Sequence, residues 1–348
     1  MEVLNIYLDT SIYMGLNFDF NNKRIKTLKE LVEDGLIILY TTSITEREVY
    51  NNIKKSVEHS RQYINSLKQE GKLLRNTPQY EHIWDRKTIV NAQVKLEESF
   101  KTFLEEAKVQ NISINSKGVY EIFDRYFELK APFSGQKKSE FPDAFVLDSL
   151  AEWSKETKQN LYVVSADNDM KNYCEDKANL VSVESLEKML DIVYHNDDVK
   201  YTYVQKIYDD YSDEFIDYMN SSIDQLLFDT YHLFGDVEVK EIKAIEMDED
   251  PLVMSIQDNK VTLVYNAEIS YTILVNYLDE TLSVYDREAG KYLFTEYDSK
   301  TVEDIESIQV EIELDVTNYE EFEFEFDKVI FNKGDTVYID LSAEYDEF

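Results

Sequence analysis

Five acidic residues in the first half of the chain lie where apolar segments give way to polar ones. They are Asp9, Glu48, Asp143, Asp167 and Asp169. Carboxylates that converge in one cleft raise one another's pKa values, and a divalent cation relieves that repulsion. Because an all-oxygen ligand set suits Mg²⁺ or Mn²⁺, two such ions about 3.5–4 Å apart could activate a water against a phosphodiester. Metal-dependent hydrolysis is therefore predicted, provided that the fold gathers these residues.

The segments around these acids alternate between strand and helix patterns. Short apolar runs typical of buried strands occur at Val3–Leu8, Leu36–Tyr40, Leu161–Val164 and Leu180–Val183. Helical patterns occur at Lys23–Glu33, from a cap at Ser43 or Thr45, from Pro142 to about Lys155, from Asp167 to about Glu175, and at Glu184–Leu190. This alternation predicts an α/β fold with a parallel sheet that helices cover on both faces.

A parallel sheet would place these acids at one edge. Asp9 ends the first strand, and Asp167 and Asp169 follow the third strand. The carboxyl ends of parallel strands share one edge, where ligands bind, so these residues should be close if their strands are neighbours. The helices that carry Glu48 and Asp143 begin at the same edge, which adds two more carboxylates.

The chain is predicted to hold more than one domain. An α/β domain should cover residues 1–190, with a helical insertion at about 55–119, and residues 191–234 should form a helical connector. From 235 to 348 the apolar residues alternate with period two, which predicts an antiparallel β-rich domain. The alternating runs are Val261–Ile273, Ile308–Val316, Phe322–Phe326 and Val337–Leu341.

Charge is divided unevenly between these parts. The formal net charge is −35, and from Asp198 onward there are 10 Lys and Arg against 39 Asp and Glu. Negative charge repels phosphates, so any nucleic-acid contact is expected from the nearly balanced first half. The acidic β-rich domain is expected to bind a protein partner or to restrain substrate access.

Several other classes of protein are excluded by composition. Cys174 is the single cysteine, which rules out a disulfide framework or a Cys-rich zinc site within the chain. The sequence contains no phosphate-binding glycine loop and no HExxH motif. The N-terminus has no signal-peptide pattern and no apolar run reaches 18 residues, so a cytoplasmic protein with no membrane contact is expected.

Four short motifs carry a resemblance to a known family. They are Leu8-Asp9-Thr10-Ser11, Thr45 with Glu48-Val49, Phe141-Pro142-Asp143-Ala144, and Val164-Ser165-Ala166-Asp167-Asn168-Asp169. In their order and spacing they resemble PIN domains, most closely the larger bacterial PIN-like families of unassigned function, over about residues 1–190. The resemblance implies metal-dependent ribonuclease chemistry with an acidic quartet of Asp9, Glu48, Asp143 and Asp167.

The resemblance also implies roles around that quartet. Asp169 would be an auxiliary metal ligand, and Thr10 and Ser165 would hydrogen-bond to the ligands. Glu46 is an alternative to Glu48, which is preferred because the family places an apolar residue directly after its glutamate. The insertion is much longer than in toxin-type PIN domains.

Basic residues of the insertion form a candidate path for nucleic acid. Lys54, Arg61, Lys68, Lys72 and Arg75 are spaced 7, 7, 4 and 3 apart, which predicts one helical face. Such a stripe could follow a phosphate backbone, and Lys137 and Lys138 could extend it. An ordinary solvated face is the alternative interpretation.

Three functions remain open. The leading one is an endoribonuclease that cuts single-stranded or loop RNA, in the manner of a toxin or defence effector. The second is a structure-specific DNA nuclease, with the long insertion as a clamp. The third is a non-catalytic interaction protein whose acidic β-rich domain recruits partners or mimics nucleic acid.

Overall fold

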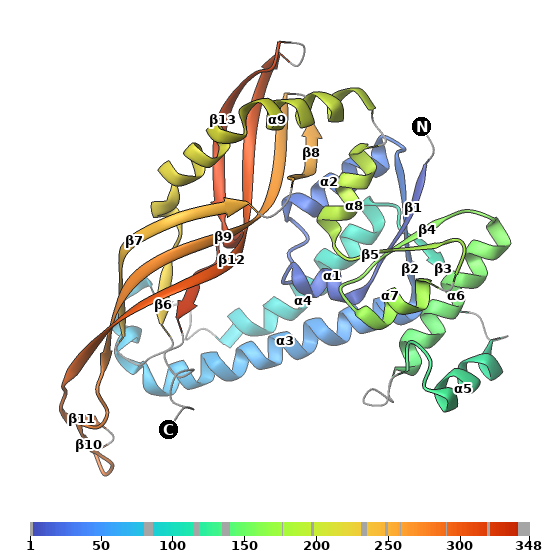
Figure 1. Ribbon diagram of the computed structural model, residues 1–348. Helices are drawn as coiled ribbons and strands as arrows, with labels where there is room; N and C mark the ends of the chain where they lie inside the picture. Colours follow the sequence, from blue (N-terminus) through green and yellow to red (C-terminus); the bar gives the residue numbers. More distant parts are fainter. Residues whose placement is uncertain are drawn as a thin grey trace. The chain divides into compact units, whose positions relative to one another are not determined.

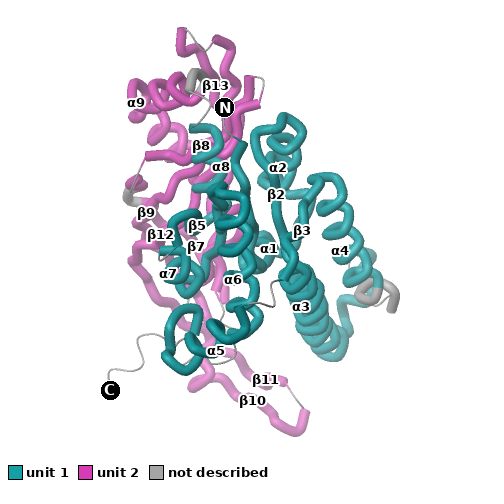
Figure 2. Tube along the Cα trace, turned by 90° about the vertical axis from the view of Figure 1, so that its right-hand side faces the viewer, with its two compact units in different colours: residues 1–196 teal, residues 197–348 magenta. Residues whose placement is uncertain are grey.

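A computed structural model describes residues 3–79, 86–114, 118–133, 140–175, 177–195, 198–230, 235–247, 250–257, 259–289, 291–318 and 321–339. The chain divides into two compact units, Met1–Asn196 and Asp197–Phe348, which Figure 2 draws in separate colours. None of the helices that the structure describes is long and apolar enough to cross a membrane.

The first unit alternates strands and helices (Figure 1). Its elements are β1 (Leu4–Leu8), α1 (Thr10–Gly15), α2 (Lys23–Glu33), β2 (Ile37–Thr42), α3 (Ser43–Glu70), the 3₁₀ helix η1 (Lys72–Asn76), α4 (Arg86–Glu106), β3 (Gln110–Ile112), α5 (Val119–Glu128), α6 (Phe141–Thr157), β4 (Leu161–Val164), α7 (Asn168–Glu175), β5 (Leu180–Val183) and α8 (Leu186–His195).

The five strands of this unit form one parallel sheet in the order β3-β2-β1-β4-β5. This confirms the predicted α/β class. Strand β1 lies at the centre, with β2 on one side and β4 on the other, where Leu8 is in register with Val164. The chain runs outward from β1 in both directions, and such a reversal of strand order is where open α/β sheets bind ligands.

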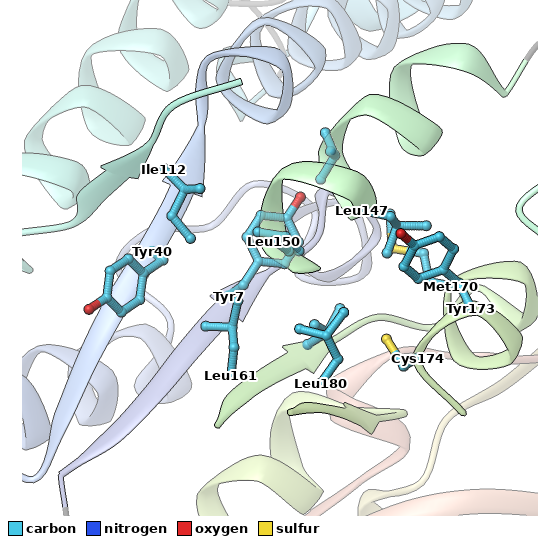
Figure 3. Packing of buried hydrophobic residues seen from close by; sticks show 12 residues of the cluster. Tyr7, Tyr40, Ile112, Leu147, Leu150, Leu161, Met170, Tyr173, Cys174 and Leu180 are labelled. Carbon is cyan, nitrogen blue, oxygen red and sulfur yellow. The ribbon is translucent and has the colours of Figure 1, made fainter. Parts of the chain in front are cut away.

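One face of the sheet is covered by α6 and α7. Leu147 and Leu150 of α6 and Met170 of α7 belong to a single buried cluster with Tyr7 and Leu161 of the strands (Figure 3). Burial of these side chains contributes about 1.5–3 kcal/mol each and fixes the start of α6 and α7 against the sheet. The same packing therefore fixes the segments that carry Asp143 and Asp167.

Helix α8 is also buried within the first unit. Leu190, Val193 and Tyr194 are buried, and α8 contacts α2. A buried ion pair joins the two helices, with Arg24 Nε at 2.6 Å from Glu187 Oε1. The first unit therefore needs α8 through His195.

The predicted helical insertion at 55–119 holds a pair of contacting helices, α3 and α4. It was predicted too long, because β3 at Gln110–Ile112 is an edge strand of the parallel sheet. Helix α3 begins directly after β2, with the side chain of Thr42 accepting the amide of Thr45, so the cap predicted at Ser43 or Thr45 was wrong. Near the end of the insertion, Phe100 and Phe103 of α4 pack edge-on against Tyr13 of α1, at distances of 5.4 and 6.1 Å between ring centroids. Aromatic packing thus anchors the insertion beside α1.

The second unit is mostly antiparallel sheet (Figure 1). Its elements are α9 (Asp198–Ser221), η3 (Ile223–Gln225), β6 (Phe228–Thr230), β7 (Asp236–Met247), β8 (Leu252–Gln257), β9 (Lys260–Leu278), β10 (Val284–Asp286), β11 (Lys291–Phe294), β12 (Tyr297–Asn318), β13 (Glu323–Phe331), η4 (Asn332–Gly334) and β14 (Val337–Ile339). The main sheet has the order β13-β12-β9-β7, and β8 also pairs with β9.

Helix α9 packs on this sheet through its aromatic side chains. Phe215 is fully buried and lies 5.0 Å from Phe326 between ring centroids, and Tyr218 stacks on Phe326 at 4.4 Å. The backbone of Tyr211 departs from helical geometry within α9. The aromatic repeat after residue 200 therefore reflects contact with strands of its own unit.

Two details of the second unit differ from the predictions. The helix ends at Ser221, and Phe228–Thr230 within the predicted connector is strand β6. Strand β14, predicted as antiparallel, pairs with β6 in parallel, and Thr230 Oγ1 donates to the Ile339 carbonyl at 3.1 Å. Pairing between segments more than one hundred residues apart overrode the local pattern in both cases.

Candidate active site at the carboxyl edge of the parallel sheet

Asp9 lies where the sheet reverses its strand order. Its amide donates to the Val164 carbonyl at 3.0 Å, which extends the β1–β4 ladder by one residue. Its side chain then caps α1 by accepting the amide of Ser11. Strand, cap and helix follow one another without a spare residue, so the position of the Asp9 carboxylate is set by backbone geometry.

Three donors hold one oxygen of that carboxylate. Asp9 Oδ2 accepts from the Ser11 amide at 3.1 Å, from Ser11 Oγ at 2.5 Å and from Ser165 Oγ at 3.1 Å. The residue is 7% exposed. Hydrogen bonds to an ionised acceptor are roughly twice as strong as neutral ones, so this network holds a buried carboxylate in one orientation.

Glu48 projects from the second turn of α3 toward α1. Thr10 Oγ1 donates to Glu48 Oε2 at 3.2 Å. A buried chain of hydroxyls fixes the start of α3, since Thr45 Oγ1 lies 2.7 Å from the Tyr7 hydroxyl and 2.8 Å from Thr42 Oγ1. Strand β1 therefore positions both Asp9 and the helix turn that carries Glu48.

Glu46, the alternative acid, lies in a different environment. Its Oε1 accepts from Asn111 Nδ2 of β3 at 3.2 Å. Residues two positions apart on a helix point about 200° from each other, which explains why only one of the pair reaches Thr10. This contact favours Glu48, the residue that we propose for the site.

Asp143 is the residue most affected by its neighbours. Burial is the largest cause that raises its pKa, and together with a hydrogen bond to Glu140 and the negative charges of Glu48, Glu140 and Asp9 it takes the pKa from 3.8 to about 9. The pKa of Glu48 is raised by burial and by Asp9 and Glu140, while the Thr10 hydrogen bond and Lys55 oppose the rise. The electrostatic coupling places four carboxyl groups in one neighbourhood.

Asp167 and Asp169 are tied to this neighbourhood through Ser165. The Asp167 amide donates to Ser165 Oγ at 3.0 Å, while Ser165 Oγ donates to Asp9. The Asp169 amide donates to Asp167 Oδ1 at 2.7 Å, at the first turn of α7. The structure therefore brings Asp167 close to Asp9 across the β1–β4 pair.

These side chains suit a hard divalent cation in their chemistry. Every proposed ligand atom is a carboxylate oxygen, and burial together with the neighbouring negative charges raises the pKa of Asp143, so a nearby cation would stabilise its ionised form. In the arrangement described for this chain, however, no three Asp, Glu, His or Cys side chains among the described residues are gathered closely enough to hold an ion. A bound cation would have to draw the carboxylates together.

Three contributors were not predicted from the sequence. Ser11 supplies two of the donors to Asp9, Tyr7 anchors the start of α3, and Glu140 acts on both Asp143 and Glu48. Glu140 stands three positions before Asp143, which is the spacing of neighbours on one helix face. That spacing was the available signal for Glu140.

The basic residues do not form one continuous stripe. Lys54, Arg61 and Lys68 lie on α3, but α3 ends at Glu70 and Gly71. Lys72 and Arg75 lie on the separate 3₁₀ helix η1, so the prediction of one helical face for all five was wrong. Helical spacing places residues on one face only when all of them belong to the same uninterrupted helix. The predicted extension at 137–138 lies outside the described residues.

Comparison with known proteins agrees with this geometry. Residues 6–170 match a family model described as a PIN domain. No significant match was found among curated proteins or among solved structures. The matched range runs from the middle of β1 to the first turn of α7 and includes Asp9, Glu48, Asp143 and Asp167. The first unit of this chain is therefore a PIN domain, the fold of a nuclease family.

Proposed function

We propose that this chain is a metal-dependent endoribonuclease that hydrolyses phosphodiester bonds in RNA. The observation that carries the proposal is the carboxylate neighbourhood at the reversal point of the sheet. Asp9 is fixed there by Ser11 and Ser165, and Glu48 is fixed by Thr10. Hydrogen bonds from neighbouring hydroxyls orient the ligand carboxylates of metal sites, and Asp9 and Glu48 both accept such bonds.

The proposal assigns a role to each acidic residue. Asp9, Glu48, Asp143 and Asp167 would hold Mg²⁺ or Mn²⁺, with Asp169 as an auxiliary ligand. The bound ions would supply an activated water and stabilisation of the leaving oxygen. Ser165 and Thr10 would keep the ligands oriented.

The substrate is expected to approach along the insertion. Lys54, Arg61 and Lys68 lie on the same continuous helix as Glu48, with Lys54 and Arg61 exposed. Lysine and arginine side chains on such a helix would attract the phosphate backbone and direct it toward the carboxylates. The preference for RNA, and a role as toxin or defence effector, are parts of the proposal that come from the family.

Cleavage assays test the proposal directly. Purified protein should cut labelled single-stranded RNA with Mg²⁺ or Mn²⁺ and should be inactive in EDTA. Asp9→Asn and Asp167→Asn should remove the activity, whereas Asp124→Asn should keep it, because Asp124 is an exposed acid of α5 outside the site. Cleavage that survives EDTA, or equal activity in all three variants, would overturn the assignment.

The α3–α4 pair favours one second candidate. Two long contacting helices could clamp a duplex or a flap, which suits a structure-specific DNA nuclease. Parallel assays with flap DNA and duplex DNA distinguish this function from the first. Metal-dependent cutting of flap DNA without cutting of RNA would replace the leading proposal. Growth arrest on expression that disappears in Asp9→Asn would support the toxin role.

A further inference from the structure

The hairpin at the far end of the second unit exposes an unusual number of large apolar side chains. Strands β10 and β11 project from the end of the β9–β12 ribbon (Figure 1), and we call residues 279–289 and 291–297 the finger. Six of its apolar residues have between 50% and 65% of their surface exposed. They are Leu282, Val284, Tyr285, Leu293, Phe294 and Tyr297.

Local hydrogen bonds give the finger a defined backbone. Asp279 Oδ1 accepts the amides of Thr281 at 2.7 Å and Leu282 at 3.1 Å, and the Asp279 amide donates to the Glu296 carbonyl at 2.9 Å. At the tip, Asp286 Oδ1 accepts the amide of Glu288 at 2.9 Å. The apolar exposure is therefore a property of a folded hairpin.

The pairing of the strands gathers these side chains. Val284 is the cross-strand partner of Phe294, and both are 53% exposed. On the same hairpin, Tyr285 packs edge-on against Tyr292 at 4.8 Å between ring centroids. Contiguous exposed apolar side chains with aromatic members are typical of protein interfaces, where such residues contribute most of the binding energy.

The charge around the finger restricts what can cover it. Five acidic and two basic residues lie between Asp279 and Tyr297, within a region that carries 39 acidic and 10 basic residues. This charge repels nucleic acid, anionic lipid and a second copy of the chain. It attracts a surface whose apolar centre is bordered by Lys and Arg.

We propose that the finger is a docking site for a protein partner that presents an amphipathic, basic helix. The two strands lie about 4.8 Å apart, and with their side chains they form a face about 10 Å wide. This width matches the diameter of one α-helix, which is also about 10 Å. The apolar face of such a helix would cover Val284 and Phe294, and its Lys and Arg side chains would meet the acidic border. Docking would be independent of the nuclease chemistry of the first unit.

A model peptide tests this chemistry on the full chain. The probe is a labelled Leu/Lys peptide about five helical turns long with all Leu on one face. A scrambled peptide of the same composition measures attraction by charge alone. Fluorescence anisotropy should give a Kd for the amphipathic peptide at least about tenfold below that for the scrambled peptide.

Substitutions locate the binding. Val284→Ser with Phe294→Ser should abolish the preference for the amphipathic peptide, and Leu282→Ser with Leu293→Ser should do the same. The matched control is Tyr120→Ser with Phe127→Ser, which removes two exposed aromatic side chains from α5 of the first unit and should keep the preference. Circular dichroism checks that each variant is folded. If the Val284→Ser, Phe294→Ser variant is not folded, the Leu282→Ser, Leu293→Ser variant provides the test.

Three results would overturn the proposal. Equal binding of the amphipathic and scrambled peptides would reduce the effect to charge. Full preference in a folded finger variant would place the binding elsewhere. Dimerisation of the wild type in sedimentation analysis that disappears in the Val284→Ser, Phe294→Ser variant would make a second copy the occupant.

Discussion

Replacing Asp143 by Asn should make the metal-free protein more stable at pH 7. The Asp143 carboxyl lies in a half-buried position near Glu140, Glu48 and Asp9, and this environment raises its pKa to about 9. Asn keeps the shape of the protonated carboxyl and cannot ionise. The substitution therefore removes a group whose ionisation is unfavourable in the folded state.

The size of the effect follows from the pKa difference. An ordinary aspartate pKa of 3.8 applies to the unfolded chain, so folding at pH 7 requires Asp143 to take up a proton. Each pH unit between 3.8 and pH 7 costs about 1.4 kcal/mol, which sums to about 4 kcal/mol. Because water still reaches this carboxyl and screens it, the expected gain from Asn is about 2–4 kcal/mol.

The sign sets the pH dependence. A carboxyl whose pKa is raised on folding leaves the protein most stable below the unfolded pKa, and stability is lost as the pH rises toward 9. The free energy of unfolding of the wild type in EDTA should therefore fall more steeply with pH than that of Asp143→Asn. Added Mn²⁺ should stabilise the wild type more than the variant.

Urea unfolding in EDTA followed by tryptophan fluorescence measures this effect. Trp153 packs against the buried cluster of the first unit, so its fluorescence reports on the unfolding of that unit. Asp124→Asn, an exposed aspartate of α5, provides the control and should change little. Equal unfolding free energies and equal pH slopes for wild type and Asp143→Asn would refute the raised pKa.

Three further outcomes are expected. Glu48→Gln should slow metal-dependent RNA cleavage by about 100-fold or more, while Glu46→Gln stays within about twofold in single-turnover assays; the opposite ranking would assign the site to Glu46. Arg24→Met should destabilise the first unit by about 3–5 kcal/mol in urea unfolding, because Glu187 loses the cation beside it in a buried position. The double replacement Arg24→Met, Glu187→Met should recover most of that loss. No recovery would contradict the ion-pair argument. A chain ending at Asn196 should fold and cleave RNA at an equal or higher rate, since α9 packs on its own unit; a folded but inactive truncation would show that the acidic unit completes the enzyme.

Much of the first unit was predictable because its strands are continuous apolar runs. Leu161–Val164 and Leu180–Val183 have the predicted bounds, since each run is short and bordered by polar residues. The placement of acids at strand ends then followed from parallel topology alone. The sequence could not order the strands, and the β1–β4 pairing that brings Ser165 to Asp9 comes from the structure.

The remaining differences arise from contacts that spacing does not encode. Strands β6 and β14 are three residues each and exist because distant segments pair. Helix α3 ends at Glu70, and the spacing of the basic residues does not reveal that end. Glu140 and burial together raise the pKa of Asp143, and burial is known only once the fold is known.

The hydrogen bond from Ser165 to Asp9 has a consequence for synthesis of the protein. The two residues are 156 positions apart, and β4 must join β1 before the bond can form. The ribosome releases Asp9 long before Ser165, so the emerging chain carries an incomplete carboxylate cluster while most of the PIN domain is being translated. The proposed active site is therefore completed only after the last strands of the sheet have left the exit tunnel.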